Sequence, residues 1–402
     1  MHHAKPTSLD QTRNPTGADD WRKPVAHRAR SNVRTLFWAT ILCGVACGCG
    51  GGRGGSNSGS DTLPPPTSAS LLAVTNATTG TIDILTIDTK TGIPTPVAGD
   101  PLPDGPTASA VSIDPQKRFL YVTSTSGEVR GYVIDPSTLN LTAVTGSPFS
   151  TSAQSVAIAI DPSGQFVLTA NGNANTVSVF EIGSTGTLAE VAGSPFAAGA
   201  SPSAIVVAAG QYVYAANTAG HSVSAYSMDT TSGALTPVAG SPFATRGAPN
   251  GLVVDPAGKH VYAAESQPNE LSGFSIDATT GALTAIPGSP FAASYAIRSP
   301  VMDAGGQRLH AANGTDVDCF LVDGSSAALT EMGLSSTNGR AIALALDGPD
   351  NFLYALDNVD NQIEVFSIAN DGSLTLISGS PFALFAGASS QNLGPNAISV
   401  QH

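Results

Sequence analysis

Short runs of alternating apolar and polar residues, separated by turn-forming residues, occupy the chain after residue 70. In residues 249–291 four such runs read LVVD at 252–255, HVYAAE at 260–265, ELSGFSI at 270–276 and LTAI at 283–286. The sequences DPAG at 255–258 and TTG at 279–281 supply residues suited to tight turns. The runs have a period of two and no helical period, which predicts a four-stranded antiparallel sheet.

This four-strand pattern recurs along the chain. The tetrapeptide GSPF has its glycine at 146, 193, 240, 288 and 379, and degenerate versions begin at Gly99 and Gly333, so that successive glycines are 45–48 residues apart. Two further columns keep the same phase: Leu85, Tyr132, Phe180, Tyr226, Phe274, Phe320 and Phe366 form the first, and Asn76, Ser124, Asn171, Asn217, Glu265, Asn313 and Asp357 form the second. Four short strands repeated every 40–50 residues or so are typical of propeller blades, and the fold class predicted is all-β, a seven-bladed β-propeller.

Because these residues recur at the same position in each repeat unit, structural roles are favoured for most of them. In GSPF, Gly and Pro turn the chain after the fourth strand, and we expect the Phe to fill the wedge between neighbouring blades. The aromatic column is predicted to be core. An Asn that follows a strand most often satisfies backbone groups in the adjoining turn, although a ring of ligands would show the same pattern.

The two ends of the repeat region predict how the ring closes. LLAVTN at 71–76 matches the second strand of the other units, and the missing first strand appears at the far end, where PNAISV at 395–400 aligns with PNGLVV at 249–254. We therefore expect the C-terminal strand to join the N-terminal blade, which removes an exposed sheet edge.

The repeats resemble those of the seven-bladed lactonase-like propellers, the group that includes bacterial 6-phosphogluconolactonase and fungal carboxymuconate cyclase. FLYVTS at 119–124, YVYAAN at 212–217 and HVYAAE at 260–265 are also similar to the YVTN-type repeats of surface propellers. The resemblance extends over residues 70–402. It implies the propeller fold and, for the enzymatic members of the family, the opening of a lactone.

Composition and charge narrow the classes of partner. Gly and Pro are abundant (43 and 28 residues), while charged residues make up only 12% of the chain. Residues 1–50 carry a net charge of +4, and the rest carries −17. A body this acidic is not expected to bind nucleic acid through counterion release or anionic lipid through a basic face.

The N-terminal segment has the order of an export signal. Arg28, Arg30 and Arg34 precede an apolar run at 35–46, which is too short to span a bilayer and leads into small residues and cysteine. A small residue directly before Cys47 and before Cys49 resembles a bacterial lipoprotein box, and the sequence predicts lipidation at Cys49, with Cys47 as the alternative. An ordinary cleaved signal, giving a periplasmic or secreted protein, and an uncleaved anchor are the other readings.

These signals predict three regions. Residues 1–49 form a leader and lipoprotein-type signal peptide, residues 50–68 form a Gly/Ser/Pro-rich flexible linker, and residues 69–402 form the propeller. The predicted location is the extracytoplasmic side of the cell envelope, where the lipid anchor alone attaches the protein to a membrane.

A ligand site is expected on one rim of the ring. The loops that enter the first strand of a blade and leave its second strand share this rim, because the two strands are antiparallel. The repeat places there Gln154, Asn171, Asn217, Asn250, Glu265, Arg298, Asn313, Arg340, Asp357 and Asn396. Arg298 and Arg340 stand out among the ten basic residues after residue 50, and together with nearby carboxylates they suit bidentate recognition of a carboxylate or phosphate. The competing interpretation is a set of surface ion pairs of little energetic consequence.

The resemblance also implies where catalytic groups would stand. Enzymatic members place Arg and His in a Pro-Arg-His step entering an inner strand, and the aligned step here is Pro249-Asn250-Gly251. A family Glu aligns with Ser266, one position after Glu265. Lactone opening with general-base assistance needs a titratable group near the carbonyl and a cation for the oxyanion, for which the sequence offers Glu265 or Asp357 and the two arginines.

Two functional hypotheses follow. The leading one is a lactonase-like propeller that binds a ligand or protein at the cell envelope, with Arg298, Arg340, Asn250, Asn396 and Gln154 as ligand-binding residues. The alternative is a hydrolase acting on sugar lactones, with Glu265 or Asp357 as the base. No phosphate loop, nucleophile elbow or paired metal motif is present in the sequence, so no cofactor or metal is expected. The expected partner of this monomer is a small anionic or sugar-derived ligand, or an envelope protein.

Overall fold

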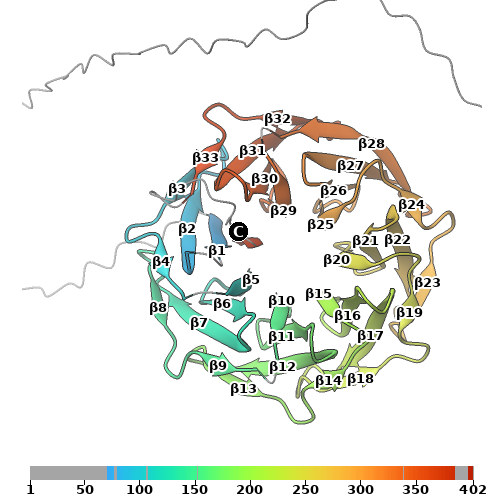
Figure 1. The fold of residues 1–402 in the computed structure, drawn as a ribbon, viewed down its shortest axis with the longest axis horizontal. Helices are drawn as coiled ribbons and strands as arrows, with labels where there is room; N and C mark the ends of the chain where they lie inside the picture. Colours follow the sequence, from blue (N-terminus) through green and yellow to red (C-terminus); the bar gives the residue numbers. More distant parts are fainter. Residues whose placement is uncertain are drawn as a thin grey trace, which may run out of the picture. The chain divides into compact units, whose positions relative to one another are not determined.

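The computed structural model describes residues 70–76, 79–105, 107–151, 153–337, 339–384 and 397–401. All of them belong to one compact unit, Asp61–His402. The elements of this part are β-strands, arranged as seven antiparallel sheets around a ring (Figure 1). The seven-bladed propeller predicted from the repeats is therefore confirmed. No helix in the described ranges has the length and apolar character needed to cross a membrane.

Each sheet is one blade, and its strands follow one another from the centre of the ring outward. The innermost strands of blades 1 to 7 are β34 (Ala397–Gln401), β5 (Ala108–Ile113), β10 (Ser155–Ile160), β15 (Pro202–Ala208), β20 (Pro249–Val254), β25 (Arg298–Met302) and β29 (Ala341–Leu346). The second strands are β1 (Ser70–Asn76), β6 (Phe119–Ser124), β11 (Phe166–Asn171), β16 (Tyr212–Asn217), β21 (His260–Ser266), β26 (Arg308–Ala312) and β30 (Phe352–Asp357).

The outer half of each blade is built from a long third strand and a short fourth one. The third strands are β2 (Thr81–Ile87), β7 (Glu128–Ile134), β12 (Thr176–Ile182), β17 (Ser222–Met228), β22 (Asn269–Ile276), β27 (Asp316–Val322) and β31 (Gln362–Ile368). The fourth strands are β3 (Pro94–Pro96), β8 (Leu141–Ala143), β13 (Leu188–Glu190), β18 (Leu235–Pro237), β23 (Leu283–Ala285), β28 (Leu329–Ser336) and β32 (Leu374–Leu376).

Six blades also carry a two-residue fifth strand, which the sequence did not predict. These strands pair with the third strand of their own blade, and they are β4 (Leu102–Pro103), β9 (Phe149–Ser150), β14 (Phe196–Ala197), β19 (Phe243–Ala244), β24 (Phe291–Ala292) and β33 (Phe382–Ala383). In five of them the first residue is the Phe of GSPF. The motif thus turns the chain back onto the outer edge of the same blade.

The GSPF motif has a specific hydrogen-bonding role in this turn. Its glycine has a positive φ of 87–91° in all five copies, a conformation that favours glycine, and the Ser–Pro peptide bond is cis. The Ser Oγ accepts a backbone N–H of the third strand, as Ser241 does from Ala225 at 2.9 Å. In blade 1, Asp100 replaces the serine, and its Oδ1 accepts the N–H of Ile84 at 2.6 Å.

Blade 6 departs from this pattern where the motif is degenerate. Its fourth strand, β28, runs for eight residues beside β27, with a register shift between Cys319 and Phe320. Because no Ser–Pro turn interrupts it, the sheet has four strands and lacks the short fifth one. Cys319, in the third strand of this blade, is a free, buried cysteine.

The ring closes through its two ends. β34 pairs with β1 in antiparallel register, for example Leu72 with Val400 and Val74 with Ile398. Leu72 and Val74 are fully buried. The C-terminal strand therefore completes the N-terminal blade, as the sequence predicted.

The core lies between neighbouring blades. Its largest fully buried side chains include Tyr121, Tyr214, Tyr262 and Tyr354 of the second strands. Each of these hydroxyls donates to a backbone carbonyl in a turn of the next blade, as Tyr214 does to Gly281 at 2.8 Å. The seams are thus filled by aromatic rings whose polar ends are satisfied.

Candidate functional site

The inner strands surround a cavity of about 630 Å³ at the centre of the ring. Each inner strand is the end strand of its sheet, so one row of its main-chain N–H and C=O groups has no strand partner and faces inward (Figure 1). Aliphatic side chains such as Val111, Val156, Ile205, Leu252 and Leu344 supply much of the wall. The cavity thus offers main-chain hydrogen bonding within a largely aliphatic frame.

A bulge at the start of the inner strand directs side chains into this cavity. In blades 2 to 7 the register with the second strand shifts at this point, as between Pro249 and Gly251. A bulged residue leaves the alternation of the strand and re-aims its side chain. Bulged residues that line the cavity are Ser109, Val156, Asn250, Ser299, Pro300 and Ile342.

Neighbouring inner strands are joined by serine hydroxyls. Ser109 Oγ donates to the carbonyl of Ser155 at 2.7 Å, and Ser203 Oγ donates to that of Pro249 at 3.3 Å. Ser299 Oγ accepts the N–H of Leu344 at 3.0 Å. These bonds fix the spacing of the strands on which the cavity residues stand.

Arg298 and Asn250 are the predicted ligand-binding residues that the structure brings to the cavity. Arg298 is the first residue of β25 and the only charged residue among the described ones that line the cavity. Its Nε and the Oδ1 of Asn250 are buried, and neither has a hydrogen-bond partner among the described residues. The two side chains come from adjacent inner strands, and both residues line the cavity.

Gly251 allows these two strands to approach each other. A Cβ at this position would lie 2.6 Å from Cδ of Pro300 and 3.1 Å from the backbone nitrogen of Ser299. Any side chain here would push β20 and β25 apart. The glycine at this step is therefore a packing requirement of the cavity wall.

The remaining predicted ligand-binding residues lie elsewhere. Arg340 is exposed, immediately before β29, and Gln154 is half-buried just before β10. Neither lines the central cavity. Asn396, together with Cys47 and Cys49, lies outside the described residues.

Glu265, one of the two predicted bases, is enclosed within blade 5. Its side chain is fully buried, and its Oε2 accepts the N–H of Gly247 in the loop that leads into β20. Burial raises the pKa of Glu265 and the nearby carboxylate of Glu270 adds to the rise, whereas the Ser272 hydroxyl and the Gly247 N–H act in the opposite direction. The next residue, Ser266, lines the cavity, but Glu265 itself does not.

Asp357, the other predicted base, closes a turn at the end of β30. Its Oδ1 accepts the N–H of Val359 at 2.8 Å, and its Oδ2 accepts from Nε2 of Gln362 at 3.0 Å. Asp357 is buried and does not line the cavity. The structure therefore does not bring either carboxylate beside Arg298.

The rest of the Asn column also acts inside the blades. Asn76 and Asn313 accept backbone N–H groups of the following turn, which is the local role that the sequence favoured. Asn171 and Asn217 instead donate to serine hydroxyls on the third strand, at 2.9 Å to Ser178 and to Ser224. Within the described ranges, no three His, Cys, Asp or Glu side chains are grouped so that they could hold a metal ion.

Sequence reasoning missed the serines that line or brace the cavity, Ser109 and Ser299 among them. Their only signal is a position one or two residues inside an inner strand. A bulge is not visible in an apolar–polar pattern, so the sequence does not single out the residues that it re-aims. Ser266 did carry a signal, because it aligns with the glutamate of the enzymatic family members.

Comparison with known proteins agrees with this architecture. A family model described as a lactonase, 7-bladed beta-propeller, matches residues 70–193 and 190–296. No curated protein matches the sequence.

Solved structures share the ring. A candidate 6-phosphogluconolactonase from Bacteroides uniformis superposes with a TM-score of 0.72 at 19% identity, covering 83% of this chain and 99% of that one. A second candidate 6-phosphogluconolactonase, from Bacteroides fragilis, gives 0.73 at 17% identity, with 84% and 99% covered. A periplasmic gluconolactonase of Pseudomonas aeruginosa gives 0.69 at 18% identity, with 83% and 99% covered. At these identities the likeness establishes the fold.

Proposed function

The chain belongs to the lactonase family of seven-bladed β-propellers, and from this premise we propose that it binds a small lactone in the central cavity and hydrolyses it. The observation that carries the proposal is Arg298, whose Nε has no hydrogen-bond partner among the described residues. Within the described part of the lining it is the one charged residue. A buried donor of this kind calls for an anionic or strongly polarised acceptor. The carbonyl oxygen of a lactone, and the carboxylate that forms from it, are such acceptors.

The reaction balances with water alone. Water adds to the lactone carbonyl carbon, the negative charge develops on the carbonyl oxygen, and the ring C–O bond then breaks. The ring oxygen takes up a proton and leaves as a hydroxyl, so that the product is a hydroxy acid. Arg298 stabilises the oxyanion and then the product carboxylate, while Asn250 and the inward main-chain groups of the inner strands hold the ring.

The attacking water must give up a proton, and the described residues that line the cavity include no carboxylate or histidine to accept it. We propose Glu265 as the base to test first, because it directly precedes the cavity residue Ser266 and its pKa is raised by burial. Asp357 is the second candidate. In either case the carboxylate would have to leave its present contacts, since neither lines the cavity.

A second function, binding without hydrolysis, is favoured by the residues that stand at the expected catalytic positions. Asn250, Gly251 and Ser266 occupy the positions at which, as the family resemblance implies, the enzymatic members place Arg, His and Glu. None of the described lining residues is a carboxylate or a histidine. A propeller that binds a hydroxy acid or a lactone without turnover would need only Arg298 and Asn250.

One assay separates the two functions. Hydrolysis of D-glucono-δ-lactone, 6-phosphogluconolactone and γ-butyrolactone by the full chain is compared with the spontaneous rate. For the hydrolase we expect turnover that falls about 100-fold in Arg298→Ala and partly recovers in Arg298→Lys. The matched control is Arg340→Ala, an exposed arginine outside the cavity, which should retain full activity.

The outcomes distinguish hydrolysis from binding and test the site itself. Turnover that is unchanged in Arg298→Ala contradicts the proposed site. No turnover, combined with gluconate binding that Arg298→Ala removes, establishes the binding function in place of hydrolysis. Loss of turnover in Glu265→Gln, together with loss of the acid limb of the pH profile, would identify the base.

We also propose that the protein is exported and lipid-anchored at the cell envelope, where a sugar-derived ligand or an envelope protein would meet it. The support is the order of arginines, apolar run and cysteines in residues 28–49, which lie outside the described part of the chain. Palmitate labelling tests this directly. Label that persists in the Cys47→Ser, Cys49→Ser double variant would contradict it.

A further inference from the structure

The seam between blades 1 and 2 lacks the phenylalanine that the GSPF motif supplies in five other blades. In blade 1 the motif reads Gly99-Asp100-Pro101-Leu102, so a leucine stands where five other blades have a phenylalanine. A methyl group placed on the motif glycine of those five blades would contact the motif Phe ring at 3.4–3.8 Å. One placed on Gly99 would meet no heavy atom within 4 Å. The space that a ring fills elsewhere is open here.

A second aromatic contact is also absent from this seam. In four other seams the turn glycine of one blade lies under an aromatic ring of the preceding blade, and Gly92 against Phe352 is the first of these. A Cβ on these glycines would come within 2.3–2.6 Å of the ring, and the other three pairs are Gly186 with Phe119, Gly233 with Phe166 and Gly281 with Tyr212. In blade 2 the corresponding turn residue is Leu139, with φ 61°, and the corresponding residue of β1 is Leu71. Leu71 and Leu102 thus stand where other blades have aromatic rings, and Leu139 stands where they have a turn glycine.

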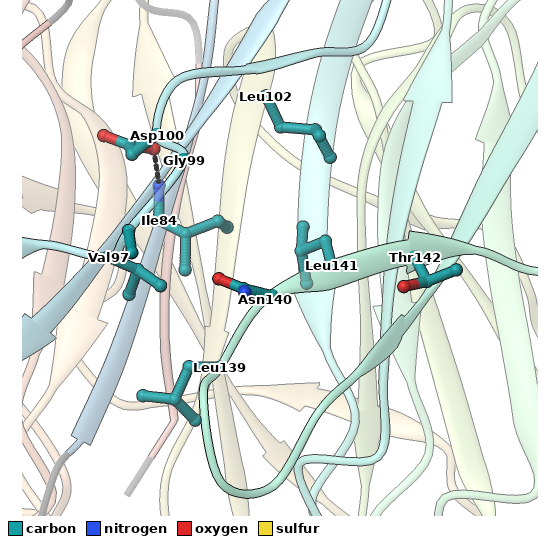
Figure 2. Close-up of a pocket in the computed structure, with 10 residues that line it drawn as sticks. Ile84, Val97, Gly99, Asp100, Leu102, Leu139, Asn140, Leu141 and Thr142 are labelled. Atoms are coloured by element: carbon teal, nitrogen blue, oxygen red, sulfur yellow. Dashed lines mark hydrogen bonds between the residues drawn. The ribbon is translucent and has the colours of Figure 1, made fainter.

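The result is a groove of about 350 Å³ between the two blades. Ile84, Val97 and Leu102 of blade 1 form one wall, and Leu139 and Leu141 of blade 2 form the other (Figure 2). The groove is separate from the central cavity, since the two share no lining residue.

Three polar side chains border these apolar walls, those of Asn140, Asp100 and Thr142 (Figure 2). Asn140, an exposed residue, places its side-chain amide between the two walls (Figure 2). Asp100 lies at one end, and its Oδ1 is already engaged by the N–H of Ile84 at 2.6 Å (Figure 2). The Asn140 amide can both donate and accept, whereas the Asp100 carboxylate is held in the role that serine has in the other blades.

We propose that this groove is a binding site for a small aromatic molecule that carries one polar substituent, with the ring between Leu102 and Leu141 and the substituent at Asn140. Five other blades indicate an aromatic ring as the occupant, because each fills the equivalent place with the phenyl group of its own motif. The leucine, isoleucine and valine walls exclude a bare ion, which would lose its hydration without compensation. The single exposed amide favours one hydroxyl or amino group over a polyhydroxylated sugar.

The test uses phenol as the probe and cyclohexanol as its non-aromatic match. Methyl-labelled full-length protein is titrated with each, and the NMR shifts of Ile84, Leu102, Leu139 and Leu141 are followed. We expect saturable shifts with phenol, and at least tenfold weaker binding of cyclohexanol. Shifts of the same residues that do not saturate, or equal binding of the two probes, would overturn the proposal.

Two variants taken from the repeat itself locate the site. Leu102→Phe restores the ring found in five other blades, so it should fold, fill the groove and weaken phenol binding at least tenfold. Asp100→Ser restores the motif serine and keeps an acceptor for the Ile84 N–H, so phenol binding should change less than twofold. Undiminished binding in Leu102→Phe, or loss of binding in Asp100→Ser, would show that phenol is held elsewhere or by the carboxylate.

Discussion

His310 occupies in blade 6 the position that a tyrosine occupies in blades 2, 4, 5 and 7. Those tyrosines bridge to a carbonyl of the next blade, but the imidazole is too short to do so, and both of its nitrogens lack a hydrogen-bond partner among the described residues. Asp303, Arg308 and Asp350 surround the resulting cavity of about 330 Å³. Burial lowers the pKa of His310 to about 4. A neutral histidine is therefore built into the seam between blades 6 and 7.

This burial predicts how stability depends on pH. The unfolded chain takes up a proton at His310 near its ordinary pKa of about 6.5, whereas the folded chain does so only near 4. The contribution of neutral His310 to the free energy of unfolding is thus fully present above pH 6.5. It is lost as the pH falls toward 4, to a total on the order of 3 kcal/mol.

His310→Tyr should remove this loss. We expect the tyrosine to reach the turn of blade 7 that carries Gly372, by analogy with its four counterparts, and to stabilise the protein by about 1 kcal/mol at pH 7. The advantage over the wild type should widen as the pH falls from 6.5 to 4. Urea unfolding at several pH values measures both effects, with exposed His221→Asn as the control. A constant difference between His310→Tyr and wild type at all pH values would contradict the assignment.

At the scale of the element, the GSPF turn is the device that shapes a blade. Apolar–polar alternation predicted the four main strands well: the expected runs at 260–265 and 270–276 became β21 and β22 with ends shifted by no more than one residue. The fifth strand was not predicted, because two residues are too few to show an apolar–polar alternation. In five blades a serine hydroxyl, and in blade 1 the Asp100 carboxylate, accepts a third-strand N–H at the turn that leads into it.

Ser241→Ala tests that role. Removing the hydroxyl leaves the Ala225 N–H without its acceptor, and we expect a cost of about 1–2 kcal/mol in the free energy of unfolding. Ser241→Asp should recover more than half of this, because Asp100 performs the same task in blade 1. Thermal unfolding of the two variants is the measurement. Equal destabilisation by alanine and aspartate would show that the hydroxyl is not acting as an acceptor.

The candidate site shows where sequence reasoning reaches its limit. Repeat phase placed Asn250, Glu265, Arg298 and Asp357 near one rim, since it counts positions along strands. The position within a repeat does not reveal which side chains a bulge turns inward. Of these four residues, only Asn250 and Arg298 line the cavity. Glu265 and Asp357 lie instead within their blades, because second strands are covered on both faces by neighbouring blades.

At the scale of the whole molecule, the ring depends on a strand contributed by the other end of the chain. Deleting residues 397–402 removes β34 and uncovers Leu71, Leu72 and Val74 of β1, all fully buried. We expect a loss on the order of 5 kcal/mol, from the lost ladder bonds and the exposed side chains. Calorimetry should show a clear fall in Tm, while deletion of His402 alone should not. An unchanged Tm after the longer deletion would contradict closure by β34.

The cavity at the centre of this ring is the basis of the functional proposal, and both hydrolysis and binding require Arg298 to hold a carboxylate there. The most direct measurement is a crystal structure of the protein with D-gluconate, the hydroxy acid that D-glucono-δ-lactone yields. We predict the carboxylate in the central cavity, with its oxygens about 2.7–2.9 Å from the Arg298 guanidinium and a further contact to Asn250. Gluconate ordered away from Arg298, or an identical complex in Arg298→Ala, would contradict the account.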